Sequence, residues 1–154
     1  KGSSSKVEIV KNELGKAVGG LSRESLFTII PYDGTAKTWR GRGALQPGTR
    51  TNVLAAAGFA RGLQPGSGTN IHDSLVLALK VKGVETIYLL SDGAPSRGGG
   101  PAEIKKRVEA MNYLLGVRVV TYGFTGSDEK LMKDLASRNW GWYRALNKSQ
   151  KKKK

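Results

Sequence analysis

The chain has 154 residues, of which 38% are apolar and 25% are charged, a balance typical of a globular protein rather than a disordered one. It carries 26 lysines and arginines against 12 acidic residues, which gives a formal net charge of +14, and it contains one histidine and no cysteine. These counts exclude disulfides, thiolate metal sites and cysteine nucleophiles, and they disfavour a histidine-based zinc site. No segment approaches the run of about 20 apolar residues that a membrane span requires.

The length fits a single domain, which we predict to span residues 1–146. The remaining residues, 147–154, form a basic tail with five lysines, and without it the formal net charge falls from +14 to +9. A like-charge run of this kind is normally a solvated segment that contacts polyanions without sequence preference. A dedicated nucleic-acid or membrane contact is the alternative interpretation of the tail.

The first predicted elements are a helix and a β-hairpin. Apolar residues recur at three- and four-residue steps from Lys6 to Leu21, which predicts an amphipathic helix. An apolar run is then followed by Asp33-Gly34 and by an alternating segment. Asp-Gly between two strand-like runs is a strong hairpin signal, so we expect Leu26–Tyr32 and Thr35–Trp39 to pair antiparallel.

Helices and strands alternate through the rest of the chain. An uninterrupted apolar run predicts a strand covered on both faces, and a proline suits the first position of a helix. The predicted elements are a helix at 52–61, a helix opening at Thr69-Asn70, a strand at 84–91, a helix at 101–115, a strand at 117–124, a helix at 127–137 and a strand at 141–146.

This order of elements indicates an α/β fold with a doubly wound, mostly parallel open sheet and one antiparallel edge hairpin. In such sheets ligands bind beyond the carboxyl ends of the strands. Asp92 directly follows the strand at 84–91 and is therefore predicted to lie at that edge. A sheet of this type is expected to open on a strand, whereas this sequence opens on a helix.

Two loops carry candidate ligands for a metal ion. The stretch "PGSGTN", residues 65–70, leads into a helix with the hydroxyl of Thr69, and "LLSDGAPS", residues 89–96, ends a strand with the carboxylate of Asp92. Mg²⁺ and Mn²⁺ prefer oxygen ligands of these types, and Mg²⁺ keeps several waters while taking one or two carboxylates. If the two loops are neighbours, Thr69 and Asp92 form part of a divalent-cation site.

These residues resemble the von Willebrand factor type A domains. The resemblance rests on "GSGTNIHDSLVLAL", residues 66–79, and on "TIYLLSDGAPS", residues 86–96, and it extends from Lys6 to about Leu146. Domains of that family build a metal-ion-dependent adhesion site from an Asp-x-Ser-x-Ser motif, a Gly-x-Thr loop and a strand-ending Ser-Asp-Gly. The resemblance implies that Thr69 and Asp92 bind Mg²⁺ or Mn²⁺, and that the open position on the cation takes an acidic side chain from a protein partner.

The sequence departs from the family because it has no Asp-x-Ser-x-Ser motif. In the family this motif lies just ahead of the first helix, where this sequence reads "KGSSSKVEIV" with Lys1 at the aspartate position. The resemblance therefore implies that the central first strand is absent from the chain and that Ser3 to Ser5 are linker. It also implies that the 154 residues alone lack part of the metal site.

Simpler interpretations exist for each candidate residue. Thr69 or Asn70 would serve as a helix cap, and Asp92 would serve as a turn residue. His72, one turn into a helix, suits a surface or packed position better than a ligand position. The three tryptophans, Trp39, Trp140 and Trp142, are predicted to pack in the core or at an edge of the sheet.

The sequence therefore predicts a non-catalytic domain that binds a protein partner through a cation. Its basic character favours an acidic partner. Catalysis is disfavoured because one histidine is a thin basis for a triad and Ser67 lacks a nucleophile-elbow pattern. The alternative is a basic nucleic-acid-associated module with the same fold and no metal.

Overall fold

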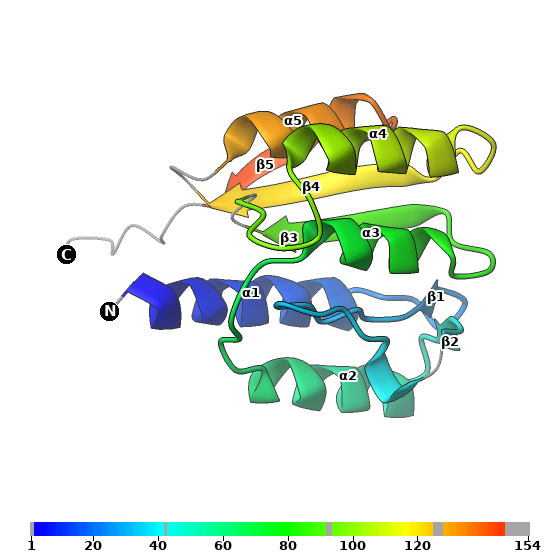
Figure 1. Cartoon of the computed structure of the whole chain (residues 1–154). Coiled ribbons are helices and arrows are strands. Elements are labelled where there is room, and N and C mark those ends of the chain that lie inside the picture. The colour runs from blue at the N-terminus through cyan, green and yellow to red at the C-terminus, as the bar shows by residue number, and fades with distance from the viewer. Residues whose placement is uncertain (1, 42, 92–93, 125–127, 147–154) are drawn as a thin grey trace.

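The computed structural model describes residues 2–41, 43–91, 94–124 and 128–146 (Figure 1). In chain order its elements are α1 (Gly2–Gly19), β1 (Leu26–Phe27), the short 3₁₀ helix η1 (Trp39–Gly41), β2 (Gln46–Pro47), α2 (Arg50–Gly62), α3 (Ile71–Leu79), β3 (Thr86–Ser91), α4 (Pro101–Asn112), β4 (Arg118–Phe124), α5 (Glu129–Ser137) and β5 (Tyr143–Leu146). The predicted alternation of helices and strands is confirmed.

Three strands form a parallel sheet in the order β3-β4-β5. Thr86 pairs with Arg118 at the start of the ladder between β3 and β4, and Ser91 pairs with Gly123 at its end. The shorter β5 pairs with the second half of β4. The carboxyl ends of all three strands therefore meet at one edge of the sheet, toward the left in Figure 1.

The predicted hairpin is present in a reduced form. Tyr32 and Ala36 form an isolated antiparallel bridge on either side of the turn at Asp33-Gly34. Farther from the turn, the N–H of Trp39 donates to the carbonyl of Ile29 at 2.8 Å. The two segments therefore face each other as expected, although they do not form a continuous ladder.

A small separate sheet joins β1 to β2, and β2 lies between the predicted hairpin and the predicted helix at 52–61, where no strand was predicted. Leu26 pairs with Pro47, and Phe27 pairs with Gln46. Proline has no N–H to donate, so Pro47 limits this ladder to a short edge pairing.

The helices begin and end near their predicted limits, with two corrections. α1 begins at Gly2, so Ser3 to Ser5 are helical and are not linker. α4 ends at Asn112 rather than at Leu115, which is exposed and does not extend the buried stripe of the helix. The early end has a cause, because the Asn112 side chain bonds to both the N–H and the carbonyl of Val117.

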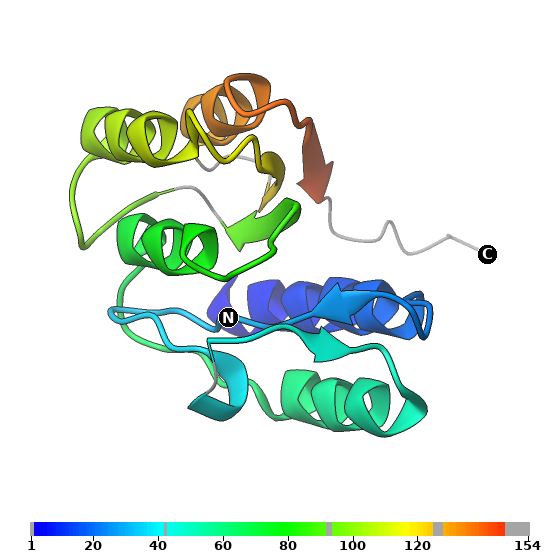
Figure 2. The same ribbon diagram turned by 90° about the vertical axis from the view of Figure 1, so that its right-hand side faces the viewer.

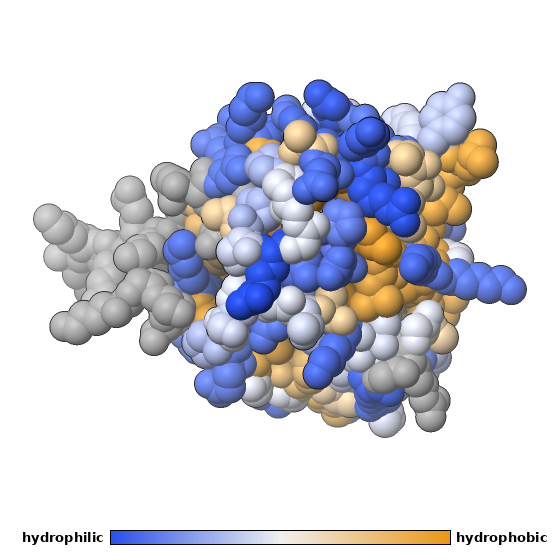
Figure 3. Space-filling view, viewed as in Figure 1, coloured by the Kyte–Doolittle hydropathy of each residue, from blue (hydrophilic) through white to orange (hydrophobic). Residues whose placement is uncertain are grey.

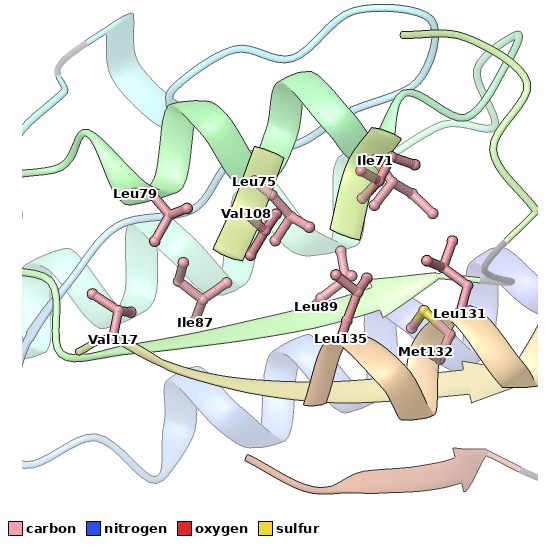
Figure 4. Close-up of a cluster of buried hydrophobic side chains, with 11 residues drawn as sticks. Ile71, Leu75, Leu79, Ile87, Leu89, Val108, Val117, Leu131, Met132 and Leu135 are labelled. Carbon is pink, nitrogen blue, oxygen red and sulfur yellow. The ribbon is translucent and has the colours of Figure 1, made fainter. Parts of the chain in front are cut away.

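One hydrophobic cluster joins α3, α4 and α5 to the parallel sheet (Figure 4). Alternate residues of β3 point to the same face, which brings its two buried apolar side chains under these helices. The buried members are Ile71, Leu75 and Leu79 from α3, Ile87 and Leu89 from β3, Ile104 and Val108 from α4, Val117 ahead of β4, and Leu131, Met132 and Leu135 from α5. This cluster fixes the helices on the sheet and so positions the loops at its ends.

A second cluster packs α1 and α2 against the segment that contains β1. Trp39 lies at its centre, stacked on Phe27 with ring centroids 5.7 Å apart and tilted against Phe59 at 6.3 Å. Figure 1 shows α1 and α2 below β3, with α4 and α5 above it. Trp39 is buried in the core, one of the two placements predicted for the tryptophans, whereas Trp140 and Trp142 are exposed on the segment that leads into the edge strand β5 and do not pack in the core.

In the described part of the chain no strand precedes α1, and β3 is an edge strand of its sheet. None of the described helices combines the length and the apolar character needed to cross a bilayer. The predicted basic tail, 147–154, lies outside the described residues.

Candidate functional site

Three loops converge at the carboxyl end of the parallel sheet. They are the turn after Tyr32, the loop at 66–70 that leads into α3, and the loop at 94–99 between β3 and α4. The N–H of Asn70 donates to the carbonyl of Asp33 at 2.7 Å, and the N–H of Ser96 donates to the carbonyl of Thr69 at 3.0 Å. Residues far apart in the sequence thus lie side by side at the edge where ligands are expected.

Thr69 is tied to the loop that follows β3 by two hydrogen bonds. Its N–H donates to Oγ of Ser96 at 2.8 Å, while its carbonyl accepts from the N–H of Ser96. This pair of bonds fixes the Thr69 backbone. Within the described residues the Thr69 hydroxyl has no hydrogen-bond partner, so it is available to a ligand.

Asn70, rather than Thr69, caps α3. Oδ1 of Asn70 accepts from the N–H of Asp73 at 3.0 Å, which satisfies one of the free donors at the helix start. The amide of the same buried side chain donates to the carbonyl of Gly34 at 3.2 Å and to Oδ2 of Asp73 at 2.7 Å. The capping interpretation therefore applies to Asn70 and leaves Thr69 without a capping role.

Two carboxylates near these loops are stabilised in their charged form. The hydrogen bond from His72 to Oδ1 of Asp73, at 2.8 Å, lowers the pKa of that carboxyl, and Asn70 lowers it further. The backbone N–H of Thr35 donates to Oδ1 of Asp33 at 2.9 Å and lowers the pKa of Asp33. Both groups are therefore negatively charged at neutral pH.

A basic side chain crosses the same surface. The stem of Arg97 lies against Gly34 and Gly68, where an added Cβ would come within 3.2 Å and 3.0 Å of its atoms. Gly68 also has φ of +94°, a conformation that other residues rarely adopt. Two glycines thus let Arg97 lie flat across the loops, and no ion pair of Arg97 occurs in the part of the chain that the structure describes.

The predicted ligands have different outcomes. Thr69 lies at the carboxyl end of the sheet, next to the loop that follows β3, whereas Asp92 lies outside the described residues, so the Thr69–Asp92 pair stays a prediction. No group of three or more histidine and acidic side chains suited to a metal ion occurs among the described residues. The donors near Thr69 are hydroxyl and carbonyl oxygens, a chemistry that fits a hard cation such as Mg²⁺ better than zinc.

Sequence reasoning missed the parts played by Ser96, Arg97 and Asp33. Ser96 has no functional part in the sequence analysis, but its hydrogen bonds to Thr69 place it at the site. Asp33 was read only as a turn residue. The signal that could have placed it is its position at the end of an apolar run, because such ends gather at one edge of the sheet.

The chain is similar in sequence to segments of much longer proteins. It is 31% identical over 159 residues to human inter-alpha-trypsin inhibitor heavy chain H4, which covers 94% of this chain and 17% of that protein. The bovine H4 protein is 30% identical over 92% of this chain and 17% of its own length. Human von Willebrand factor A domain-containing protein 3B is 27% identical over 93% of this chain and 11% of its own length. No family model matches the chain.

The fold is similar to solved structures over nearly the whole chain. A von Willebrand factor type A structure from Catenulispora acidiphila superposes with a TM-score of 0.82 at 17% identity, covering 94% of this chain and 35% of that one. The chain therefore has the fold of a von Willebrand factor type A domain. Proximal thread matrix protein 1 from the mussel byssus shares this type A fold with a TM-score of 0.66 at 19% identity, over 90% of this chain and 36% of that one.

The type A fold matches the resemblance inferred from the segments at 66–79 and 86–96, and the predicted α/β fold is confirmed. The chain spans about a sixth of the length of its H4 relatives. The functions of those whole proteins are therefore not assigned to this chain.

Proposed function

We propose that this type A domain is a non-catalytic module that binds a protein partner through a divalent cation at the carboxyl end of its sheet. The observation that carries the proposal is the pair of hydrogen bonds between Thr69 and Ser96. These bonds hold the Thr69 hydroxyl, which has no hydrogen-bond partner among the described residues, beside Ser96, four residues after Asp92 in the sequence. One relative of this chain is named for the von Willebrand factor A domain, which supports an interaction role.

Thr69 and Asp92 are the proposed ligands, and Mg²⁺ or Mn²⁺ is the proposed ion. When bound mainly by hydroxyls and water, such a cation stays electrophilic and attracts a carboxylate from outside. Ser96 fixes the backbone of Thr69 through hydrogen bonds. Asn70 and His72 form hydrogen bonds with the carboxylate of Asp73. A carboxylate held by its own neighbours does not compete for the ion.

The charge of the chain suits a partner that presents an acidic residue. The formal net charge is +14, and Arg97 adds a cation beside the proposed site. Opposite charge speeds encounter between partners and discriminates against basic ones. The alternative, a nucleic-acid module without metal, has no support from the fold or from the named relatives, and we do not propose it.

Titration of Mn²⁺ into the chain, followed by isothermal calorimetry, tests the cation site. We expect Thr69→Ala and Asp92→Asn each to weaken Mn²⁺ binding by at least about ten- to a hundredfold, the loss typical for residues that only support the direct ligands of a metal ion. Thr51→Ala is the matched control, because Thr51 is exposed on α2, away from these loops. Equal Mn²⁺ affinity in the Thr69 and Thr51 variants, or no binding by the unaltered chain, would contradict the proposal.

A further inference from the structure

The amino ends of the parallel strands form a second surface, at the opposite end of the sheet from the candidate cation site. Three segments meet there: 80–85 between α3 and β3, 113–117 between α4 and β4, and 138–142 between α5 and β5. Figure 1 shows the loop from α4 to β4 at the right-hand limit of the molecule, and Figure 2 views this end face on. Nothing in the proposed cation site uses this surface.

Two of these loops expose large apolar side chains, which we call the loop-tip patch. Tyr113 is 82% exposed, Leu114 is 89% exposed and Trp140 is 60% exposed, and the patch also contains the exposed Leu115 and Trp142. Figure 3 shows hydrophobic side chains gathered toward the right of the molecule, where these strands begin. A single exposed leucine needs no explanation, but five such residues on two neighbouring loops indicate a contact surface.

Buried hydrogen bonds fix the backbone of the two loops that carry the patch. Asn112 and Asn139 are almost completely buried, and the amide of Asn112 donates to Oδ1 of Asn139 at 2.9 Å. Asn112 also bonds to both backbone groups of Val117, and the carbonyl of Asn139 accepts from the N–H of Val119 at 2.9 Å. These bonds fix the backbone under both loops, so the exposed side chains are not the result of a loosely held turn.

Trp140 is held in an unfavourable backbone conformation. Its φ is +54°, in the left-handed region that a bulky residue rarely adopts. Gly141, the next residue, lies so close to the carbonyl of Val119 that a Cβ would have no room. A strained residue that points an indole into solvent is the kind of local outlier that accompanies a functional surface.

Basic residues accompany the patch on the same three loops. Segments 80–85, 113–117 and 138–142, together with the first residue of β4, hold four basic residues, Lys80, Lys82, Arg118 and Arg138, against one acidic residue, Glu85. Arg138 is paired with Glu109 at 2.8 Å. Within the described residues the other three basic side chains form no ion pair, so they remain available to external anions.

We propose that the loop-tip patch docks on an anionic lipid bilayer surface. Tryptophan and tyrosine favour the boundary between headgroups and acyl chains, and leucine at the tip of a loop inserts just below it. The unpaired lysines and the arginine match the negative charge of the headgroups. Side chains this exposed fit a deformable surface such as lipid, and the docking leaves the carboxyl end of the sheet facing away from the bilayer.

Sedimentation with lipid vesicles tests the docking. We expect the chain to bind vesicles of phosphatidylcholine with phosphatidylserine and not vesicles of phosphatidylcholine alone, with no effect of a metal chelator. Leu114→Ala combined with Leu115→Ala lowers partitioning by about tenfold or more, as expected for loss of two inserted leucine side chains. Leu54→Ala is the matched control, because Leu54 is 60% exposed on α2, outside the patch.

Tryptophan fluorescence gives a direct second readout. Trp39 is buried, so a shift of emission to shorter wavelength on adding anionic vesicles reports Trp140 and Trp142. Three outcomes overturn the proposal: no binding to anionic vesicles, binding that the double leucine variant leaves unchanged, or a dimer in sedimentation velocity that the same variant disperses. The last outcome would assign the patch to a second copy of the chain. Loss of Mn²⁺ binding through Thr69→Ala leaves the lipid result untouched, so the two proposals fail separately.

Discussion

Buried asparagine side chains lie at both ends of the parallel sheet, but the surfaces that they support differ in chemistry. At the carboxyl end, Asn70 joins the start of α3 to the turn at Gly34, and polar groups with ligand chemistry surround it. At the amino end, Asn112 and Asn139 join two loops whose outer side chains are apolar. One sheet therefore presents two different surfaces, each built on a fixed backbone, and strand direction decides which residues belong to which end.

The largest loss of stability is expected when the hydrogen bond between Asn112 and Asn139, under the loop-tip patch, is broken. Asn112→Ala removes bonds to Val117 and to Asn139 and leaves buried polar groups without partners. Each unsatisfied buried group costs about 1–3 kcal/mol, so we expect unfolding in urea to show a loss of roughly 3 kcal/mol. Tyr113→Ala, at the neighbouring exposed position, should stay within about 0.5 kcal/mol of the unaltered chain. Similar losses in both variants would contradict the distinction between the fixed base and the exposed tips.

A matched pair of glycines compares the two ends directly. Gly98, at the carboxyl end, has φ of +76°, and an added Cβ would collide with Oδ1 of Asn70. Gly116, at the amino end, has φ of +64°, and no atom lies within 4 Å of an added Cβ. We expect Gly116→Ala to lower the free energy of unfolding by about 1 kcal/mol through backbone strain alone. Gly98→Ala causes the same strain and also displaces the Asn70 cap, which costs about 0.5–2 kcal/mol more.

The glycine variants are compared by thermal or urea unfolding together with Mn²⁺ titration. We expect Gly98→Ala to destabilise the chain more than Gly116→Ala. We also expect only Gly98→Ala to weaken cation binding, because Asn70 adjoins Thr69. Equal destabilisation, with cation binding unchanged in both, would show that the loops at the carboxyl end tolerate rearrangement.

Local signals in the sequence predicted much of this architecture. Pro101 marked the first residue of α4, the Asp33-Gly34 pair marked a turn, and the apolar run of β3 marked a strand of a parallel sheet. These features depend on a few neighbouring residues, and so they can be read directly. The segments at 66–79 and 86–96 indicated the type A fold for the same reason.

Long-range partners could not be read from the sequence. Asn112 and Asn139 are 27 residues apart, and neither has a sequence signal that names the other. Without that pair, a helix pattern running on to Leu115 looks continuous, and Trp140 looks like a core residue. The exposed patch appears only when the structure shows that α4 stops at Asn112 and that the chain then turns outward.

The smallest effect tests the electrostatics of the carboxyl end. His72→Ala removes the hydrogen bond that lowers the pKa of Asp73, so that pKa should rise toward its usual value of 3.8. The stabilisation from the lowered pKa is present above the unfolded-state pKa and is lost as pH falls through the folded-state value. Asp73 is more than half exposed, so solvent screening keeps the change in stability well below about 1 kcal/mol.

NMR titration of the side-chain carboxyl carbons measures the shift in the pKa of Asp73. Asp33 is the internal control, because its lowered pKa comes from Thr35 and should not move. An equal shift at both carboxyls would mean that His72 acts through the whole loop cluster rather than through its contact with Asp73.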